Sequence, residues 1–351
     1  MDLYEIVNPL LDWYAANARV LPWRDEPTPY RVWVSEIMLQ QTRVEAVIPY
    51  FERFVTELPD VEALARAEEE KLMKLWEGLG YYSRVRNLQK AAQAVLRDYG
   101  GELPSQPEEL AKLPGIGAYT AGAVASIAYG QPAPAVDGNV LRVIARVTAS
   151  RANVSENPVK RAMEQDLKRV YPRGRAGDFT QALMELGALV CVPNGAPKCG
   201  ECPLASLCTA RAQGIAEELP VKAAKKERKV EQRTVFLILC DENAVIQKRP
   251  EKGLLAGLWE FPGAEEPLTK TGAQDWLTAH GFAPAKLEHL PKAKHIFTHV
   301  EWQMTGWLAV VPEVPPGSGF VTASRTELLE TYTLPAAYKS FLNQYIELSG
   351  D

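Results

Sequence analysis

The sequence lacks several features that would have restricted its function. No stretch contains 18 or more consecutive apolar residues, so we expect no membrane-spanning helix. The first 20 residues begin with acidic side chains and lack a basic n-region, so we expect no secretory signal and a cytoplasmic protein. An excess of positive charge is also absent. The net charge is -5, which by itself argues against a protein that coats nucleic acid.

The charge is distributed unevenly along the chain. At roughly 150 residues per domain, 351 residues predict two or three domains, and 46% hydrophobic and 24% charged residues are typical of globular proteins. Residues 138–230 carry 16 Lys and Arg against 9 Asp and Glu, whereas residues 1–137 and 231–351 are both acidic. The basic stretch fits either a surface that faces phosphate or a solvated helical surface.

The spacing of apolar residues changes along the chain. From residue 1 to about 215, apolar residues recur at helical spacing, which predicts an all-α domain. Segment 216–232 is charged and nearly free of large apolar residues, so we interpret it as a linker. The α+β domain expected over 233–351 has strands at 233–240, 243–248 and within 294–311, and helices at 271–281 and 335–348. The helices expected before the linker lie at 1–17, 30–42, 61–76, 84–99, 107–112, 117–129, 139–148, 157–171 and 178–191.

Four of the five cysteines are clustered. Seven, two and five residues separate Cys191, Cys199, Cys202 and Cys208, and clustered thiols without a secretory signal favour metal binding over disulfides. Tetrahedral zinc usually takes two closely spaced pairs, and only one is present. The wider outer gaps favour an iron–sulfur cluster with a thiolate on each iron, although zinc and four free thiols remain alternatives. The metal's expected role is to hold a short loop together.

Residues 112–122, KLPGIGAYTAG, predict two helices joined by a tight turn. Gly115 and Gly117 leave successive backbone N–H groups pointing outward at a helix N-terminus, an arrangement that binds phosphate oxygens. The alternative is a plain connection between two helices. Residues 76–84, WEGLGYYSR, place glycines beside Tyr81 and Tyr82, and a tyrosine on a loop can wedge into a duplex. The alternative there is a capped helix followed by buried aromatic residues.

Two carboxylates are candidates for catalysis. Glu36 lies in the middle of a nearly all-apolar helix over 31–44; a buried carboxyl group has a raised pKa and suits a general acid. Alternatively, Glu36 and Gln40 lie on the one solvent-exposed face of that helix. Asp137 follows the rigid segment PAPAV, which would present its carboxylate at a fixed place. Asp137 also precedes an apolar-periodic run, so an ordinary helix N-cap is the alternative.

These motifs occur together in one order. The segments VSEIMLQQTRV, WEGLGYYSRVRNL, LPGIGAYTAGA and VDGNVLRV, followed by the four cysteines, closely resemble the MutY family of adenine DNA glycosylases over nearly the whole chain. The resemblance implies a multi-domain protein. An all-α helix–hairpin–helix glycosylase domain, with a six-helix module and a 4Fe–4S cluster module, is joined to an α+β Nudix-like C-terminal domain. It also implies a monomer that acts on double-stranded DNA containing A:8-oxoguanine or A:G.

The resemblance implies that adenine is flipped into a pocket and its N-glycosidic bond is hydrolysed. Glu36 matches the general acid that protonates adenine N7, and Asp137 matches the carboxylate that stabilises the oxocarbenium ion. Asn139 and Tyr119 match neighbours that orient these groups. Relatives resembling endonuclease III carry a Schiff-base lysine at the position of Tyr119, and a phenol cannot form an imine. We therefore expect a monofunctional glycosylase that leaves an abasic site, rather than a glycosylase/lyase.

Further residues take their expected roles from the same resemblance. A loop of the C-terminal domain, Phe297-Thr298-His299, matches the segment that reads 8-oxoguanine, which is usually Phe-Ser-His. No Nudix catalytic box is recognisable after Gly263, so we expect a recognition module rather than a pyrophosphatase. The expected adenine pocket is lined by Arg24, Leu39 and Gln181, and the residues expected beside the opposite 8-oxoguanine are Gln41, Thr42, Leu79 and Tyr81.

The cysteine loop departs from the family pattern in two ways. The first cysteine gap has seven residues where the family usually has six, and Asn194 and Gly195 can absorb the insertion in a turn. The loop is also less basic than usual, with only Lys198.

An alternative hypothesis from another functional class is a catalytically silent, cluster-bearing protein that binds DNA or senses redox state. In that case Glu36 and Asp137 would be structural only.

Overall fold

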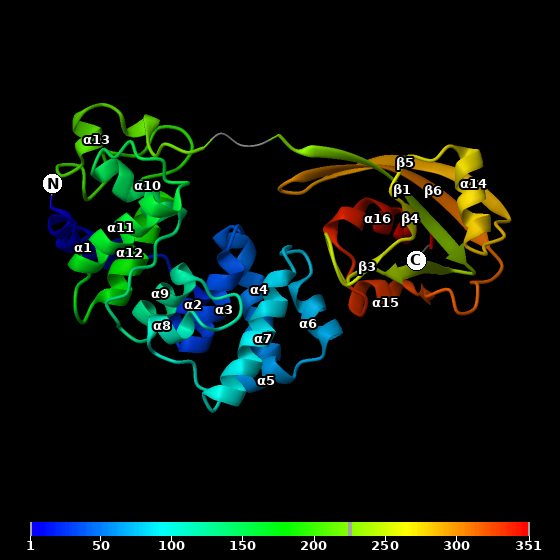
Figure 1. The fold of residues 1–351 in the computed structure, drawn as a ribbon, viewed down its shortest axis with the longest axis horizontal. Helices are drawn as coiled ribbons and strands as arrows, with labels where there is room; N and C mark the ends of the chain where they lie inside the picture. The colour runs from blue at the N-terminus through cyan, green and yellow to red at the C-terminus, as the bar shows by residue number, and fades with distance from the viewer. Residues whose placement is uncertain (1, 224–226, 350–351) are drawn as a thin grey trace. The chain divides into compact units, whose positions relative to one another are not determined.

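The computed structural model describes residues 2–223 and 227–349 and contains two compact units (Figure 1). Unit 1 comprises Met1–Ala67 and Ser83–Ala224, and unit 2 comprises Glu68–Tyr82 and Lys225–Asp351. The sequence predicts a continuous helical domain over 1–215, whereas residues 68–82 pack with the C-terminal part of the chain. The expected linker 216–232 includes residues 224–226, which lie outside the described residues.

Unit 1 is helical, and polar N-caps begin several of its helices. Thr28, Asp60 and Asp137 each accept a backbone N–H of the first helical turn, which satisfies a donor that has no partner within the helix. Helix α4 was not predicted, because Pro49 lies inside it and a proline usually ends a helix. The elements are η1 Leu3–Ile6, α1 Val7–Asn17, α2 Pro22–Asp25, α3 Pro29–Leu39, α4 Val44–Glu57, α5 Val61–Arg66, α7 Ser83–Asp98, α8 Pro107–Leu110, α9 Ala118–Ile127, α10 Gly138–Val147, α11 Asn157–Val170, α12 Ala176–Leu189, α13 Thr209–Ala212 and η2 Ala216–Glu218.

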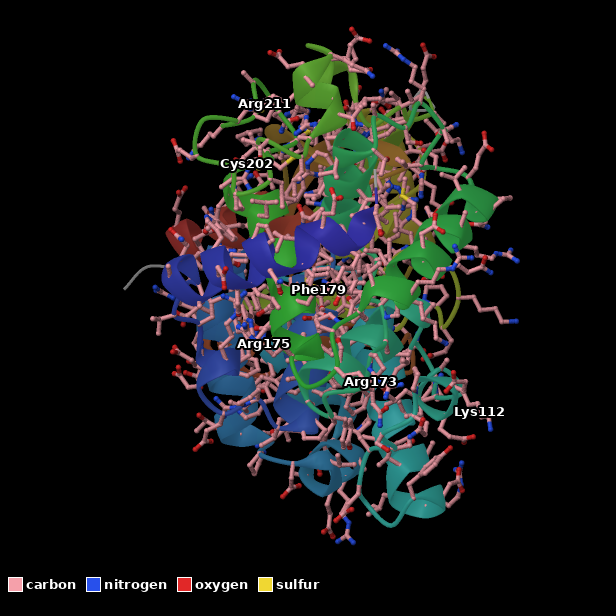
Figure 2. The ribbon with its side chains drawn as sticks, turned by 90° about the vertical axis from the view of Figure 1, so that its left-hand side faces the viewer. Lys112, Arg173, Arg175, Phe179, Cys202 and Arg211 are labelled. Carbon is pink, nitrogen blue, oxygen red and sulfur yellow. The ribbon has the colours of Figure 1, made fainter. Side chains whose placement is uncertain are left out.

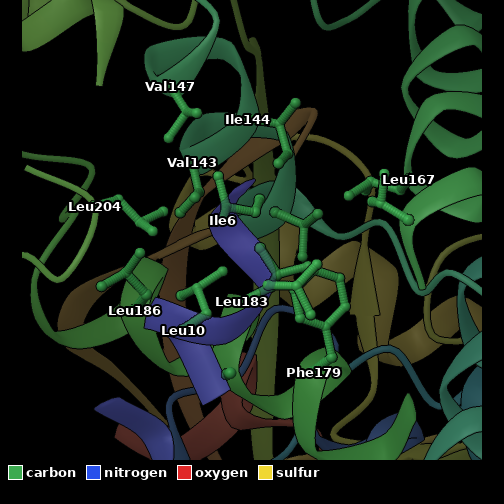
Figure 3. Packing of buried hydrophobic residues seen from close by; sticks show 14 of the residues in the cluster. Ile6, Leu10, Val143, Ile144, Val147, Leu167, Phe179, Leu183, Leu186 and Leu204 are labelled. Carbon is green, nitrogen blue, oxygen red and sulfur yellow. The ribbon is translucent and has the colours of Figure 1, made fainter. Parts of the chain in front are cut away.

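One apolar core joins the two ends of unit 1. Ile6 and Leu10, from the beginning of the chain, pack with Val143 of α10 and with Phe179 and Leu183 of α12 (Figure 3). All five side chains are fully buried. Burial on this scale contributes about 1.5–3 kcal/mol per large apolar side chain, so it fixes α10 and α12 against each other. These two helices carry Asp137 at the start of α10 and Gln181 on α12.

The beginning of the expected linker packs against unit 1. The Leu219 carbonyl oxygen accepts a hydrogen bond from Nε of Arg146 at 3.0 Å, and the Val221 carbonyl oxygen accepts one from the backbone N–H of Val154, also at 3.0 Å. Residues up to 223 are therefore part of the helical unit rather than a free tether. None of the helices in the described ranges combines the length and the apolar character needed to cross a membrane.

Unit 2 is built on a mixed sheet with the strand order β3-β2-β1-β6-β5, in which β4 pairs with β1 and β7 with β2. The turn at Asp241 and Glu242 joins β1 to β2, as predicted, and β1 pairs in parallel with β6 along its whole length. The elements are α6 Glu69–Trp76, β1 Lys229–Cys240, β2 Asn243–Lys248, β3 Trp259–Glu260, β4 Gly263–Ala264, α14 Lys270–Ala279, β5 Lys286–Ile296, β6 Val300–Val311, β7 Phe320–Ala323, α15 Arg325–Glu330, η3 Ala336–Tyr338 and α16 Lys339–Leu348.

Helices cover both faces of this sheet. Successive side chains of a strand point to opposite faces, so Val235 and Leu237 of β1 join a core that includes residues of α15 and α16. Phe236 and Ile238 join a second core, completed by α14. The run TVFLILC is therefore apolar throughout because both of its faces are buried.

Candidate active site

A cavity in unit 1 collects eight of the residues singled out from the sequence. Helices α2, α3, α9, α10 and α12 contribute to its wall, so segments distant in the sequence meet there. The eight residues are Arg24, Glu36, Leu39, Thr42, Tyr119, Asp137, Asn139 and Gln181.

Glu36 is buried and does not lie on a solvent-exposed face of its helix. Its side chain lies among the buried positions 32–38 of α3, and its carboxylate accepts a hydrogen bond from the Tyr119 hydroxyl group. The pKa of Glu36 is raised to about 7. Burial is the main cause; the hydrogen bond from Tyr119 opposes the rise, and the nearby charge of Asp137 adds to it. A carboxyl group of this kind holds its proton close to neutral pH and can donate it to a ligand in the cavity.

Asp137 caps a helix and faces the cavity at the same time. Its Oδ1 accepts the backbone N–H of Val140 at 2.7 Å, and its Oδ2 accepts Nδ2 of Asn139 at 2.7 Å. Burial raises the pKa of Asp137, whereas these two bonds lower it by stabilising the carboxylate. The helix cap is therefore confirmed, and the same side chain also lines the cavity.

Asn139 is held in one orientation. Arg142 donates from NH2 to Oδ1 of Asn139 at 2.8 Å and to the carbonyl oxygen of Gly187 at 2.8 Å. Because the amide oxygen of Asn139 faces Arg142, its amide nitrogen faces Asp137. Gly187 allows α12 to approach this closely: a Cβ atom at that position would lie 2.5 Å from Cβ of Asn139. The position of the Asp137 carboxylate therefore depends on α12 as well as on α10.

The same cavity contains a network of charged side chains that was not predicted from the sequence. Glu185 is 1% exposed and pairs with Nε of Arg19 at 2.7 Å and with NH2 of Arg24 at 3.0 Å. Burial acts to raise the pKa of Glu185, but the bonds from Arg19 and Arg24 lower it to about 2. Arg24 also donates from Nε to Oε1 of Gln181 at 2.9 Å, so the amide nitrogen of Gln181 is the group placed to donate to a ligand. The available signal was a glutamate four residues after Gln181 on an apolar helix.

Other predicted residues of unit 1 lie outside this cavity. Gln41 is exposed and has a left-handed backbone, with φ 60°, just after α3. Gly115, with φ 76°, lies in the turn between α8 and α9, and Gly117 is the N-cap of α9. A Cβ atom on Gly115 would lie 2.7 Å from Cβ of Asn87, so the turn requires glycine for space as well as for conformation.

The remaining predicted DNA-contacting residues belong to unit 2. Residues 297–299 form the turn between β5 and β6, in which the backbone N–H of Phe297 donates to the Val300 carbonyl oxygen at 2.8 Å. The Phe297 ring packs edge-on against Trp302, while Thr298 and His299 are exposed. Leu79 is buried, whereas Tyr81 is 45% exposed and its hydroxyl group is hydrogen-bonded to the Thr298 hydroxyl group.

The four clustered cysteines line a second, small pocket in unit 1. All four are partly buried and none forms a disulfide, and NH1 of Arg146 donates to Sγ of Cys191 at 3.2 Å. Across the described ranges, no three or more His, Cys, Asp or Glu side chains are placed to hold a single metal ion. Four thiols that line one pocket can supply the four thiolates of an iron–sulfur cluster, and four thiolates also suit one zinc ion. The residues are Cys191, Cys199, Cys202 and Cys208.

The basic stretch 138–230 is only partly a surface. Arg142 and Arg146 are 4% and 3% exposed and donate to carbonyl oxygens and to Cys191, so they are internal. Arg173, Arg175 and Arg211 are exposed and are labelled in Figure 2. The charge counted from the sequence therefore overstates the positive surface that is available to phosphate.

The comparisons with known proteins match both units. Residues 34–173 match the model of the HhH-GPD superfamily base excision DNA repair protein, and residues 234–344 match the NUDIX domain. A solved thermostable thymine-DNA glycosylase is 29% identical with a TM-score of 0.55, covering 60% of this chain and 96% of that chain. Endonuclease III in a non-covalent complex with DNA is 26% identical with a TM-score of 0.51, covering 61% and 99%. Fold and site define a DNA glycosylase with a helix–hairpin–helix domain and a Nudix-like C-terminal domain.

The similarity to curated proteins is more specific than this class. The adenine DNA glycosylase of Homo sapiens is 36% identical over an alignment 403 positions long, which covers 96% of this chain and 73% of that protein. The chain belongs to the adenine DNA glycosylase family. The resemblance drawn from the motifs is therefore confirmed, together with the predicted class of enzyme.

Proposed function

We propose that this protein removes adenine mispaired with 8-oxoguanine, or with guanine, from double-stranded DNA and leaves an abasic site. The observation that carries the proposal is the pair of buried carboxyl groups in one cavity. Burial raises the pKa of Glu36 to about 7, and the Asp137 carboxylate accepts two hydrogen bonds that stabilise its charge. Two carboxyl groups in environments that separate their protonation states are typical of glycosidic bond hydrolysis.

The reaction follows from the different states of these groups. The protonated carboxyl group of Glu36 gives its proton to N7 of adenine. The bond between C1′ and N9 then breaks, and its electron pair leaves with the base. The negative charge of Asp137 stabilises the oxocarbenium ion at the sugar. Water adds to C1′ and releases a proton to the carboxylate of Glu36, which restores the starting state.

The cavity also fits a flipped purine base. Its lining combines Arg24 and Gln181 with hydrophobic residues such as Leu39, and the amide nitrogen of Gln181 can donate to a purine ring nitrogen. Among the described residues that line the cavity there is no lysine, and Tyr119 cannot form an imine. We therefore propose hydrolysis without strand cleavage.

We propose that the partner base and the DNA backbone are held by residues outside the cavity and by Thr42, which also lines it. Gln41, Thr42, Leu79 and Tyr81 would lie beside 8-oxoguanine, and residues 297–299 would read its oxidised edge. Gly115 and Gly117 leave backbone N–H groups free to bind phosphate at the start of α9. The similarity to endonuclease III in complex with DNA supports this use of the hairpin. No glutamate lies on α14, which supports a reading module over a pyrophosphatase.

We further propose that Cys191, Cys199, Cys202 and Cys208 hold a 4Fe–4S cluster. Its iron atoms would bind the thiolates and hold residues 191–208 together. Arg146 donates a hydrogen bond to Sγ of Cys191, so its positive charge would stabilise the partly buried thiolate of that cysteine. A visible absorption band typical of iron–sulfur proteins tests this assignment.

The deciding experiment is an excision assay on matched duplexes. The protein is incubated with duplexes that differ only in carrying adenine opposite 8-oxoguanine, guanine or thymine, and the products are treated with alkali. We expect strand breaks at the adenine opposite 8-oxoguanine and guanine, and only after alkali. The absence of an alkali-labile site at that adenine would refute the proposal, and breaks without alkali would refute the monofunctional mechanism.

The Tyr119 hydroxyl group is expected to set the pH range of excision. Its hydrogen bond stabilises the charged form of Glu36, so Tyr119→Phe should raise the pKa of Glu36 above about 7. More of Glu36 then remains protonated at alkaline pH, and the alkaline limb of the single-turnover rate profile should move to higher pH. Tyr129→Phe, whose hydroxyl group instead donates to the Leu103 carbonyl oxygen, is the matched control. A limb that stays in place or moves to lower pH would contradict this role.

A further inference from the structure

Helix α6 packs with the C-terminal sheet domain through three polar side chains. Glu70, Lys74 and Glu77 are spaced four and three residues apart, so they lie on one face of the helix. Each contacts residues of the C-terminal part of unit 2. We call these three residues the α6 seam.

Glu70 binds the edge of the sheet. Its Oε1 pairs with Nζ of Lys248 on β2 at 3.2 Å, and its Oε2 accepts Nε1 of Trp259 on β3 at 3.2 Å. The Trp259 ring is held edge-on against Tyr332, with ring centroids 4.7 Å apart. The carboxylate therefore meets a cation and an indole N–H that the sheet already fixes in position.

Lys74 and Glu77 bind α15 and the segment that follows it. Nζ of Lys74 donates to the carbonyl oxygens of Leu328 at 3.2 Å and Tyr332 at 3.1 Å, and pairs with Oε2 of Glu77 at 2.7 Å. Oε1 of Glu77 accepts the backbone N–H of Leu334 at 2.9 Å. The side chain of Lys74 is only 18% exposed, so its bonds are shielded from water and worth more than those of an exposed pair.

The seam leads directly into the loop of residues 78–82. Gly78 and Gly80 have positive φ values, and Nε1 of Trp76 donates to the Gly80 carbonyl oxygen at 3.1 Å, which ties the loop to the last residue of α6. At its far end the Tyr81 hydroxyl group bonds to Thr298, in the turn between β5 and β6. The C-terminal domain therefore contacts the helix that leads into this loop, through the α6 seam, and the loop itself, through Thr298.

We infer that the C-terminal domain positions the loop carrying Leu79 and Tyr81 through Glu70, Lys74 and Glu77. This inference rests on the proposed function, in which that loop lies beside the oxidised guanine. Selectivity for 8-oxoguanine then has two sources in the C-terminal domain: direct contact by residues 297–299, and placement of a loop from the N-terminal half of the sequence. Glu70, Lys74 and Glu77 are positioning residues and do not touch the DNA.

The test uses the full-length protein and two seam variants. Lys74→Met removes the ammonium group but keeps the aliphatic stem, and Glu70→Gln is the milder change. Lys90→Met, at an exposed lysine on α7, is the matched control. Single-turnover excision is measured with adenine opposite 8-oxoguanine and opposite guanine, alongside backbone hydrogen exchange of residues 77–82 and thermal unfolding.

We expect Lys74→Met to lower the ratio of the two rates roughly three- to tenfold, with the rate opposite guanine near its wild-type value. Hydrogen exchange in residues 77–82 should become faster, and combination with Thr298→Ala should be non-additive. Equal ratios and equal exchange in the seam variants and Lys90→Met would overturn the inference. A parallel loss with both substrates and a lower melting temperature in both seam variants would also overturn it, because that outcome indicates a structural role alone. If the wild-type protein excises no adenine, the proposed function fails, and the exchange measurement still decides whether the seam orders the loop.

Discussion

Glu36→Gln is expected to lower the rate of adenine excision by about 10²–10⁴-fold, the usual contribution of a general acid. Glutamine fills the same space in α3 and can still accept the hydrogen bond from Tyr119, but it has no proton to give to N7. The loss should therefore appear in the single-turnover rate. The affinity for a duplex that carries a non-hydrolysable adenosine analogue should be retained.

The pH dependence separates this role from a structural one. Since the pKa of Glu36 is raised to about 7, the acid form is depleted as pH rises through that value, and wild-type excision should fall there. The same shift makes the folded state bind the proton more tightly than the unfolded chain. The contribution of Glu36 to stability is therefore present below about pH 4.5 and lost as pH rises through about 7. Glu36→Gln should remove both dependences. Glu164→Gln, at another glutamate whose pKa burial raises, is the control, and a Glu36→Gln variant that excises at the wild-type rate would rule out the general acid.

Asp137→Asn is expected to reduce excision by about 10²–10³-fold, the range for loss of a preorganised electrostatic group. Asparagine is as good an N-cap as aspartate, so α10 should still begin at Gly138 and the melting temperature should change little. What disappears is the negative charge beside the sugar. The measurement is the single-turnover rate together with thermal unfolding of the same sample.

The chain offers a matched control for the capping role. Asp60 caps α5 in the same way, accepting the backbone N–H of Ala63 at 2.8 Å, but it does not line the cavity. Asp60→Asn should leave excision unchanged. Equal, small effects of the two substitutions on excision would mean that Asp137 is a cap and nothing more.

The parts of the fold predicted from sequence are those governed by local patterns. The periodicity of α7, α10 and α12 and the turn at Asp241 are written into neighbouring residues. Helix α4 was missed because it contains Pro49 and a proline usually ends a helix, and the parallel pairing of β1 with β6 joins strands about 70 residues apart. Such pairings depend on the packing of both sheet faces, which periodicity alone does not reveal.

In the candidate site, too, local patterns could be predicted from the sequence and long-range contacts could not. Glu36 and Asp137 could be singled out because a lone acid in an apolar helix, or one following a rigid segment, is conspicuous. The ion pairs of Glu185 with Arg19 and Arg24 could not, because they join residues about 160 positions apart on surfaces that only the folded core brings together. Likewise, nothing in the pattern of residues 69–76 shows that their polar face belongs with the C-terminal sheet.

The α6 seam has a consequence for the order in which the chain is made. The ribosome completes α6 early, whereas Leu328, Tyr332 and Leu334 emerge roughly 250 residues later. At about 5–20 residues per second, that interval is roughly 10–50 s. During it Lys74 and Glu77 have no partners at the end of the chain to position the loop that follows them. A nascent or prematurely terminated chain therefore contains Glu36 and Asp137, the proposed catalytic carboxylates, before it contains the contacts that position residues 78–82.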